Sequence, residues 1–236
     1  MSEPLWQLVD RCPVPGSSGT MELLRRRHEL VIRVDDRELM CNQVHGSEDA
    51  LADLACDRLA DLSEARILIG GLGMGFTLAS ALRRVGAEAK VVVAELVPGI
   101  VRWNQGELGE ASGQPLKDPR ASVHDGDVAD VIRSAAAAWD AILLDVDNGP
   151  VGLTRASNAW LYTPEGLDAS FRALRSGGVL GVWSAAPDKG FTRRVDRAGF
   201  DVVPVEVRSR GARGGKVHVI WLGTRRAVAP PWARIG

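Results

Sequence analysis

The chain has 236 residues, of which 45% are hydrophobic and 25% charged, and this composition excludes a chain that is disordered throughout. Lys and Arg number 29 against 30 for Asp and Glu, so the net charge of -1 gives no overall field that would attract nucleic acid or an anionic membrane. At roughly 150 residues per domain, the length predicts one large domain with a small appendage. We therefore expect neither a nucleic-acid partner nor a membrane partner.

The first residues do not combine a basic segment with an apolar stretch, so they do not resemble a secretory signal. No apolar run approaches the ~18 residues of a membrane helix. Cys12, Cys41 and Cys56 are widely spaced and form no metal-ligand pair such as CxxC, and the histidines are equally scattered. These features predict a reduced, cytoplasmic protein without a metal site.

Residues 1–46 are expected to form a small N-terminal segment. Residues 1 to about 20 contain a Pro- and Gly-rich stretch and predict an irregular loop. Between residues 21 and 40, two apolar stretches flank Asp35 and Asp36, a pattern that predicts a β-hairpin. Leucines and alanines then recur at helical spacing and predict an amphipathic helix over residues 47–62.

Strands and helices alternate from residue 66 to residue 198. Short apolar strands are expected at residues 66–69, 90–94, 121–124, 141–144 and 179–183, and Gly177 and Gly178 are expected to form a turn before the last of them. Helices are expected at residues 75–85, from Pro98 onward, and at residues 128–138, 164–174 and 188–198. Continuous apolar strands alternating with helices are typical of a parallel sheet that helices cover on both faces.

Two further strands are expected at residues 200–207 and 217–222. The segment that joins them is too short for a helical crossover, so these strands should be antiparallel. The sequence thus predicts an α/β, Rossmann-like fold over residues 47–223, with a mostly parallel seven-stranded sheet and a final antiparallel strand. Residues 224–236 are expected to form a peripheral tail.

A glycine cluster lies between the first predicted strand and its helix. Glycines allow close approach of the backbone to a ligand and a positive φ, and the start of the helix offers free N–H groups. A tight structural turn would also explain the cluster. Glu95 ends the next strand, where a carboxylate can accept hydrogen bonds from both ribose hydroxyls. From Gly71 the sixth position is Phe76 instead of glycine, which disfavours NAD and an oxidoreductase.

The GxGxG spacing from Gly71 resembles motif I of the class I S-adenosylmethionine-dependent methyltransferases, whose sheet also ends with a reversed strand. That resemblance implies an adenosyl cofactor, with an acidic side chain after the third strand near the adenine amino group. The residues that it assigns to the cofactor are Gly70, Gly71, Gly73, Gly75, Glu95, Gly126, Asp127 and Asp145. Asp127 is also a candidate helix N-cap, and the two roles are compatible.

Two carboxylates, Asp145 and Asp147, follow the strong apolar strand at residues 141–144. Ligands of open α/β sheets bind beyond the carboxyl ends of the strands, so both side chains should face the site. Close together they would repel each other, and a cationic amine would relieve that repulsion. A structural turn at Asn148 and Gly149 is the alternative interpretation.

A narrower resemblance covers three segments, namely residues 67–75, 145–152 and 161–167, which look like the spermidine synthase family. In that family a small N-terminal β-region precedes a methyltransferase-like domain, and an aminopropyl group passes from decarboxylated S-adenosylmethionine to an amine. The resemblance implies Asp145 or Asp147 as the catalytic base, Tyr162 on the acceptor side, and a homodimer.

The chain departs from the family pattern at three places. The family motif GGGDGG has an aspartate where this chain has Gly73, so an aminopropyl tail would lose its carboxylate partner. One extra residue after Asp145 leaves open whether Asp147 or Asn148 takes the position of the base. In the segment where the family carries Tyr-His-Glu, Glu48 is the suggestive residue.

These departures favour methyl transfer from S-adenosylmethionine to a small, amine-bearing acceptor, with Asp145, Asp147 and Tyr162 at the acceptor. The first alternative is a polyamine aminopropyltransferase that uses decarboxylated S-adenosylmethionine. The second is a protein that binds a nucleoside and catalyses nothing.

Overall fold

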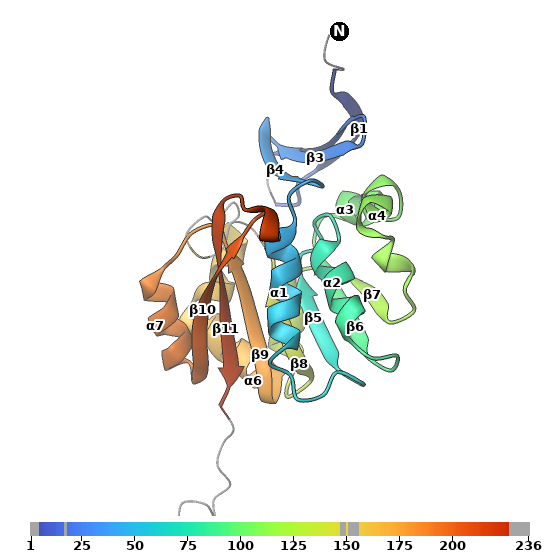
Figure 1. The fold of residues 1–236 in the computed structure, drawn as a ribbon. Coiled ribbons are helices and arrows are strands. Elements are labelled where there is room, and N and C mark those ends of the chain that lie inside the picture. The colour runs from blue at the N-terminus through green and yellow to red at the C-terminus, as the bar shows by residue number, and fades with distance from the viewer. Residues whose placement is uncertain (1–4, 17, 147–149, 151–155, 227–236) are drawn as a thin grey trace, which may run out of the picture.

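The computed structural model of the protein describes residues 5–16, 18–146, 150 and 156–226. Its strands form two separate sheets, a small antiparallel one and a seven-stranded one. The small sheet lies over one end of the larger sheet, next to the tops of α1, α2 and α3 (Figure 1).

The small sheet has the order β1-β2-β3-β4, and all its neighbours are antiparallel. Its strands are β1 (Gln7–Pro13), β2 (Thr20–Arg26), β3 (Glu29–Val34) and β4 (Arg37–Cys41). The hairpin predicted around Asp35 and Asp36 is the β3–β4 turn, where both residues have positive φ. The loop predicted for residues 1–20 is wrong in part, because Gln7–Pro13 pairs with β2 and buries Cys12 against the core.

The large sheet has the order β10-β11-β9-β8-β5-β6-β7. Its strands are β5 (Arg66–Gly70), β6 (Lys90–Glu95), β7 (Ala121–Asp125), β8 (Trp139–Leu144), β9 (Leu174–Ser184), β10 (Phe200–Arg208) and β11 (Val217–Arg225). Strands β7, β6, β5, β8 and β9 are parallel, and β11 is antiparallel to both of its neighbours. The predicted fold class is confirmed, and the reversed final strand lies inside the sheet, between β9 and β10.

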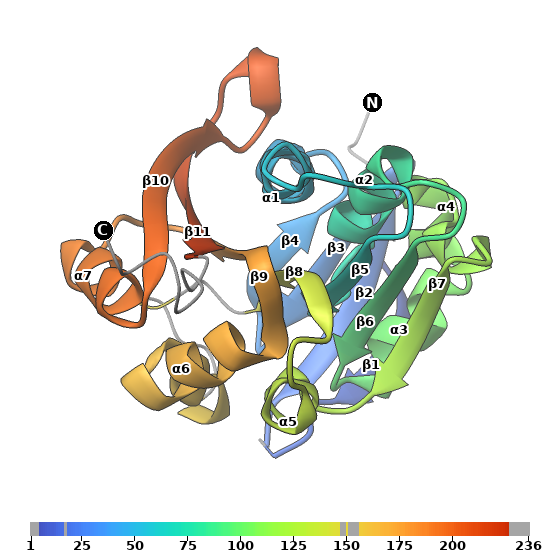
Figure 2. The ribbon, with the colours of Figure 1, turned by 90° about the horizontal axis from the view of Figure 1, so that it is seen from below.

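Helices cover both faces of the large sheet (Figure 2). They are α1 (Gly46–Cys56), α2 (Phe76–Arg84), α3 (Pro98–Asn104), α4 (Glu107–Ser112), α5 (Val128–Ser134), α6 (Pro164–Ala173) and α7 (Lys189–Arg197), with short 3-10 turns η1 (Pro115–Lys117), η2 (Ala156–Tyr162) and η3 (Gly211–Arg213). Alternate residues of β5 enter different cores, Ile67 and Ile69 the core under α1 and α2, and Leu68 the core under α5 and α6. Among the described residues, no helix has the length and apolar character needed to cross a membrane.

Several predicted boundaries differ from the observed ones. Helix α1 ends at Cys56 and not at residue 62, and α5 ends at Ser134 and not at residue 138. Strand β9 begins at Leu174 and continues through Gly177 and Gly178, which the sequence predicts as a turn. The pairing of β9 with β8 is irregular near this point, and Gly177 has a φ of 76°. A glycine bulge within a strand has therefore replaced the expected turn.

The two sheets are joined by polar contacts and by a shared core. The Asp10 carboxylate accepts hydrogen bonds from the Arg102 guanidinium at 2.6 Å and from the Trp103 indole N–H at 2.7 Å. Leu23 and Ile32 of the small sheet belong to the same buried cluster as residues of α2 and α3. The small sheet is thereby held over the carboxyl ends of the parallel strands, where ligands of such folds bind.

Candidate active site

A cavity of about 1290 Å³ lies between the small sheet and the carboxyl ends of the parallel strands. Strands β3 and β4 line it on one side, and the loops after β5, β6, β7 and β8 line it on the other. The cavity is also lined by the predicted site residues Gly71, Gly73, Glu95, Gly126, Asp127 and Asp145. The fold therefore brings together residues from four separate segments of the sequence.

The glycine loop after β5 needs its glycines for conformation and for space. Gly71 has a φ of 87°, and a Cβ atom there would lie 2.6 Å from the carbonyl oxygen of Asp145. Gly70 and Gly75 shape the loop from behind, because Cβ atoms at these positions would meet Val128 at 3.0 Å and the Asn104 side-chain oxygen at 2.8 Å. The loop therefore adopts a backbone path close to the cavity that other residues would obstruct.

Glu95 is buried at the end of β6, with 9% of its surface exposed. One carboxylate oxygen accepts the backbone N–H of Leu72 and the other accepts that of Val97, each at 2.8 Å. Burial raises the pKa of Glu95 even though these hydrogen bonds act in the opposite direction. Each carboxylate oxygen can accept more than one hydrogen bond, so Glu95 retains capacity for ligand hydroxyls while it fixes the glycine loop.

Asp127 follows β7 and caps α5. Its side chain accepts a hydrogen bond from the backbone N–H of Ala129 at 2.8 Å, so the N-cap alternative is confirmed. The residue also lines the cavity, and the N–H of the preceding Gly126 bonds to the Glu95 carbonyl at 3.0 Å. Capping thus fixes Asp127 at the cavity wall beside Glu95.

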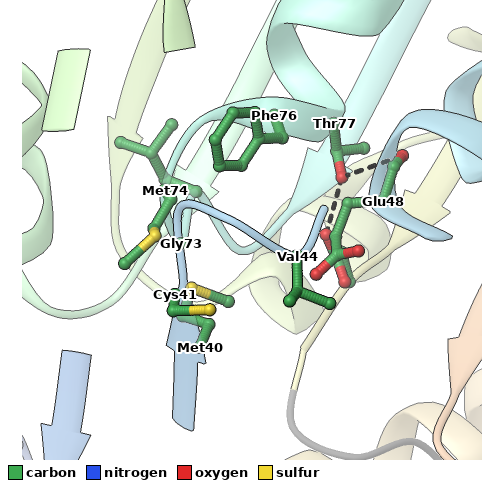
Figure 3. Close-up of a pocket in the computed structure, with 10 residues that line it drawn as sticks. Met40, Cys41, Val44, Glu48, Gly73, Met74, Phe76 and Thr77 are labelled. Carbon is green, nitrogen blue, oxygen red and sulfur yellow. Dashed lines mark hydrogen bonds between the residues drawn. The ribbon is translucent and has the colours of Figure 1, made fainter. Parts of the chain in front are cut away.

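Two carboxylates line a small hollow at the inner end of the cavity (Figure 3). The Thr77 hydroxyl, in the first turn of α2, donates a hydrogen bond to Asp145 at 2.6 Å. Burial raises the pKa of Asp145 to about 6. Burial and the negative charge of Asp145 raise the pKa of Glu48, near the start of α1, to about 7. Both carboxylates thus have pKa values raised toward neutral pH, which suits a general base.

Apolar side chains surround the rest of the hollow, and Figure 3 shows Met40 and Cys41 of β4 beneath Gly73. A Cβ atom at Gly73 would lie 3.0 Å from the Met40 methyl carbon and 3.1 Å from its sulfur. In this chain the space next to position 73, where the spermidine synthase motif has an aspartate, is thus occupied by a thioether.

Of the predicted catalytic residues other than Asp145, Tyr162 is the one that lies among the described residues. Asp147 and Asn148 lie outside the described residues, so the choice between them as the base remains a prediction. Tyr162 is 5% exposed and packs in the core against Phe191, and its hydroxyl donates to the Val146 carbonyl at 3.2 Å. In this conformation Tyr162 is a buried core residue that supports the chain after β8, and its expected place at the acceptor stays a prediction.

Sequence reasoning missed several residues that line the cavity. Thr77 and Met40 carry no local signal, because a threonine in a helix and a methionine in a strand are ordinary core residues. The hairpin between β10 and β11 adds His218 and Lys216 to the wall, and β9 adds Trp183. Glycines in that hairpin indicate a turn, but nothing in the sequence shows that the turn reaches the start of α1.

A comparison with models of protein families finds no match to the chain. Polyamine aminopropyltransferase 1 of Streptomyces coelicolor is 32% identical over 125 residues, which are 52% of this chain and 23% of that relative. The chain therefore matches less than a quarter of the length of this curated relative.

Solved structures match over most of the chain. A spermidine synthase in complex with the transition state analogue AdoDATO has a TM-score of 0.73 and 18% identity, covering 92% of this chain and 72% of that one. The spermidine synthase from Thermotoga maritima has a TM-score of 0.74, with the same identity and coverage. A probable spermidine synthase from Corynebacterium glutamicum has a TM-score of 0.59 and 20% identity, covering 94% of this chain and 80% of that one.

The resemblance drawn from the glycine cluster and the segment after Asp145 is confirmed by these comparisons. The chain is similar in sequence to a polyamine aminopropyltransferase over 52% of its length, and it is similar in fold to spermidine synthases.

Proposed function

We propose that the protein is a transferase that moves the aminopropyl group of decarboxylated S-adenosylmethionine to an amine. The observation that carries this proposal is a single cavity in which a glycine loop and Glu95 adjoin the buried carboxylates of Asp145 and Glu48. The similarity to a polyamine aminopropyltransferase, and to a spermidine synthase in complex with a transition state analogue, supports the same reaction.

In this proposal the first half of the site holds the adenosyl part of the donor. Glu95 accepts the ribose hydroxyls, the backbone at Gly71 and Gly73 allows close approach, and Asp127 meets the adenine amino group. Glu95 suits this role because its two bonds to backbone N–H groups fix both carboxylate oxygens before the donor arrives. A preorganised acceptor loses little conformational entropy on binding.

The second half of the site acts on the acceptor amine. The donor carbon beside the sulfonium is already activated, so the protein has to position the amine, exclude water and remove a proton. The neutral amine nitrogen forms a bond to this carbon while the carbon–sulfur bond breaks and leaves its electron pair on sulfur. The new ammonium then gives a proton to Asp145, which the Thr77 hydroxyl holds in place.

Methyl transfer from intact S-adenosylmethionine, which the sequence analysis favours, becomes the second candidate. The relatives support aminopropyl transfer instead. One observation still favours the methyl reaction, because Met40, and no carboxylate, lies beside Gly73, where the family motif has the aspartate that would bind an aminopropyl ammonium.

Calorimetric titration with each donor tests the proposal before an acceptor is known. Tighter binding of the decarboxylated donor supports aminopropyl transfer, whereas tighter binding of the intact donor would favour methyl transfer. Glu95→Gln should weaken the binding of both donors, because the ribose contacts are shared. If neither donor binds, the proposed adenosyl site is wrong.

A further inference from the structure

The start of α1 docks against the β10–β11 hairpin, a contact between segments about 170 residues apart in sequence. The backbone N–H of Gly46 donates a hydrogen bond to the Ser209 carbonyl at 2.8 Å. Next to this contact, Ser47 is fully buried, and its hydroxyl donates to the Glu48 carboxylate at 2.6 Å. The Nδ1 atom of His218 lies 3.0 Å from the same hydroxyl oxygen.

These contacts form a continuous chain of hydrogen-bonding groups from Glu48 through Ser47 to His218. His218 is half-buried, lines the large cavity, and stacks edge-on against Trp183 with ring centroids 4.8 Å apart. One end of the chain is therefore the carboxylate pair in the small hollow, and the other end is an imidazole that faces the wider part of the cavity.

The charges around Glu48, Ser47 and His218 favour movement of a proton from one of these residues to the next. Burial and the positive charge of Lys216 lower the pKa of His218, so the imidazole is neutral at pH 7 and able to accept a proton. Glu48 faces the charges of Asp145, at the end of β8, and of Asp49, on α1. Asp49 forms an ion pair with Arg83 at 3.2 Å and a hydrogen bond with His45 at 2.7 Å, so its charge is partly compensated.

We propose that Ser47 and His218 are positioning residues that form a proton relay between the Glu48–Asp145 pair and the water of the cavity. The relay extends the proposed transferase function, because each transfer to an amine releases one proton that must leave the buried carboxylates. Neither residue touches the reacting atoms.

Each step of the relay moves one proton and no other atom. Protonated Glu48 donates its proton to the Ser47 oxygen, while the Ser47 hydroxyl proton passes to Nδ1 of His218. His218 then releases its Nε2 proton to water, which leaves ionised Glu48 and an imidazole that carries its proton on Nδ1. Exchange of the ring protons with water then restores the imidazole that carries its proton on Nε2.

The relay makes a prediction that needs no substrate, because the charge of Glu48 sets the tautomer of His218. When Glu48 is ionised it accepts from Ser47, so His218 donates from Nδ1. When Glu48 is protonated it donates to the Ser47 oxygen, and the Ser47 hydroxyl donates to Nδ1 of His218. His218 then carries its proton on Nε2. Nitrogen-15 NMR of the imidazole should therefore show a change from the Nδ1–H to the Nε2–H tautomer as the pH falls through about 7.

Two variants and a control complete this experiment. Glu48→Gln and Ser47→Ala should each abolish the pH-dependent change of tautomer, and His28→Asn, on the exposed β2–β3 turn, should leave it intact. A His218 tautomer that stays constant through the titration of Glu48 would overturn the relay. Because this readout uses the free protein, it is independent of whether either donor binds.

Turnover provides the second readout once an amine acceptor is in hand. His218→Asn keeps a hydrogen-bonding group near Ser47 but cannot carry a proton, so kcat should fall by about tenfold while the KM for the donor stays constant. Added imidazole should restore part of the rate. If kcat is unchanged, or if the KM rises instead of kcat falling, His218 has only a structural role.

Discussion

At the level of single residues, the proposed reaction depends on buried carboxylates that differ in their surroundings. Glu95 bonds to two backbone N–H groups, whereas Asp145 accepts from one hydroxyl and faces the negative charge of Glu48. The two backbone N–H groups hold the Glu95 carboxylate in place as an acceptor of hydrogen bonds. At Asp145, burial raises the pKa to about 6, into the range where a carboxylate can take and release a proton.

Asp145→Asn should reduce transfer by about 10² to 10⁴-fold, because an amide cannot accept the proton of the amine. Binding of the donor, measured by calorimetry, should change little. Asp130→Asn on the exposed surface of α5 is the matched control and should keep full activity. Full activity of the Asp145 variant with a genuine acceptor would show that the base lies elsewhere.

The rate should depend on pH in a direction set by the same pair. The pKa values of Asp145 and Glu48 are raised to about 6 and about 7, and only the ionised forms accept a proton. The kcat/KM should therefore fall as the pH decreases through 7 and then through 6. Glu48→Gln should remove the upper part of this decrease, and a flat profile in the unmodified protein would contradict the assignment.

The raised pKa values also predict how these two groups affect stability. The folded protein binds protons at Asp145 and Glu48 at a pH where the unfolded chain has released them. Their contribution to the free energy of unfolding should thus be largest at low pH and should be lost as the pH rises through about 6 and 7. Chemical denaturation at several pH values measures this, and Glu48→Gln should weaken the dependence.

Gly73→Asp tests what Met40 does beside the glycine loop. A side chain at position 73 would contact Met40, so the single variant should lower Tm. Met40→Ala in the same chain should recover part of this loss, because it removes the contacting thioether. The double variant should also bind the decarboxylated donor more tightly than the unmodified protein does. Independent, additive effects of the two substitutions on Tm would contradict the contact.

At the scale of elements, the N-terminal sheet is held in place by Asp10. Its bonds to Arg102 and Trp103 lower the pKa of Asp10 to about 2. Asp10→Asn should lower Tm by roughly 2 to 4 °C at neutral pH, as expected for the loss of about one hydrogen bond. The difference should vanish as the pH falls toward 2, where Asp10 is protonated in both states. An equal loss at all pH values would point to packing instead of charge.

Most of the large sheet follows from local sequence, whereas the small sheet does not. Val91, Val93 and the apolar run at 141–144 are buried, and Val92 is half-buried, within a parallel sheet covered on both faces. Such apolar runs can be recognised from the sequence. Strand β1 contains Asp10, Arg11 and Pro13, and it becomes a strand only through pairing with β2 and contact with α3. Tertiary contacts thus override a local composition that indicates a loop.

The candidate site, like the fold, could be predicted only in part from the sequence. The glycine loop, Glu95, Asp127 and Asp145 could be predicted because each ends or follows a strand at the same edge of the sheet. Glu48 and His218 meet there only because α1 docks against a hairpin far along the chain. Such a contact depends on the packing of complete elements, and single-sequence patterns do not encode it in any local form.

At the scale of the whole molecule, the cavity exists because one sheet lies over the end of another. Met21, Ile32 and Met40 of the small sheet face Glu95 and Asp145 of the large one across the same space. The contact between the sheets excludes water from one wall of the site, which strengthens electrostatic interactions within it. The proposed reaction therefore needs both sheets, although the nucleoside contacts that we propose come from residues at the end of the large sheet alone.

The most direct test of the account identifies the product that the donor leaves behind. The purified protein is incubated with decarboxylated S-adenosylmethionine and a panel of diamines, and in parallel with intact S-adenosylmethionine, and the products are resolved by mass spectrometry. We expect 5′-methylthioadenosine and an amine enlarged by one aminopropyl group, formed only from the decarboxylated donor. The Asp145→Asn variant should form neither product. Formation of S-adenosylhomocysteine and a methylated amine from the intact donor would contradict it.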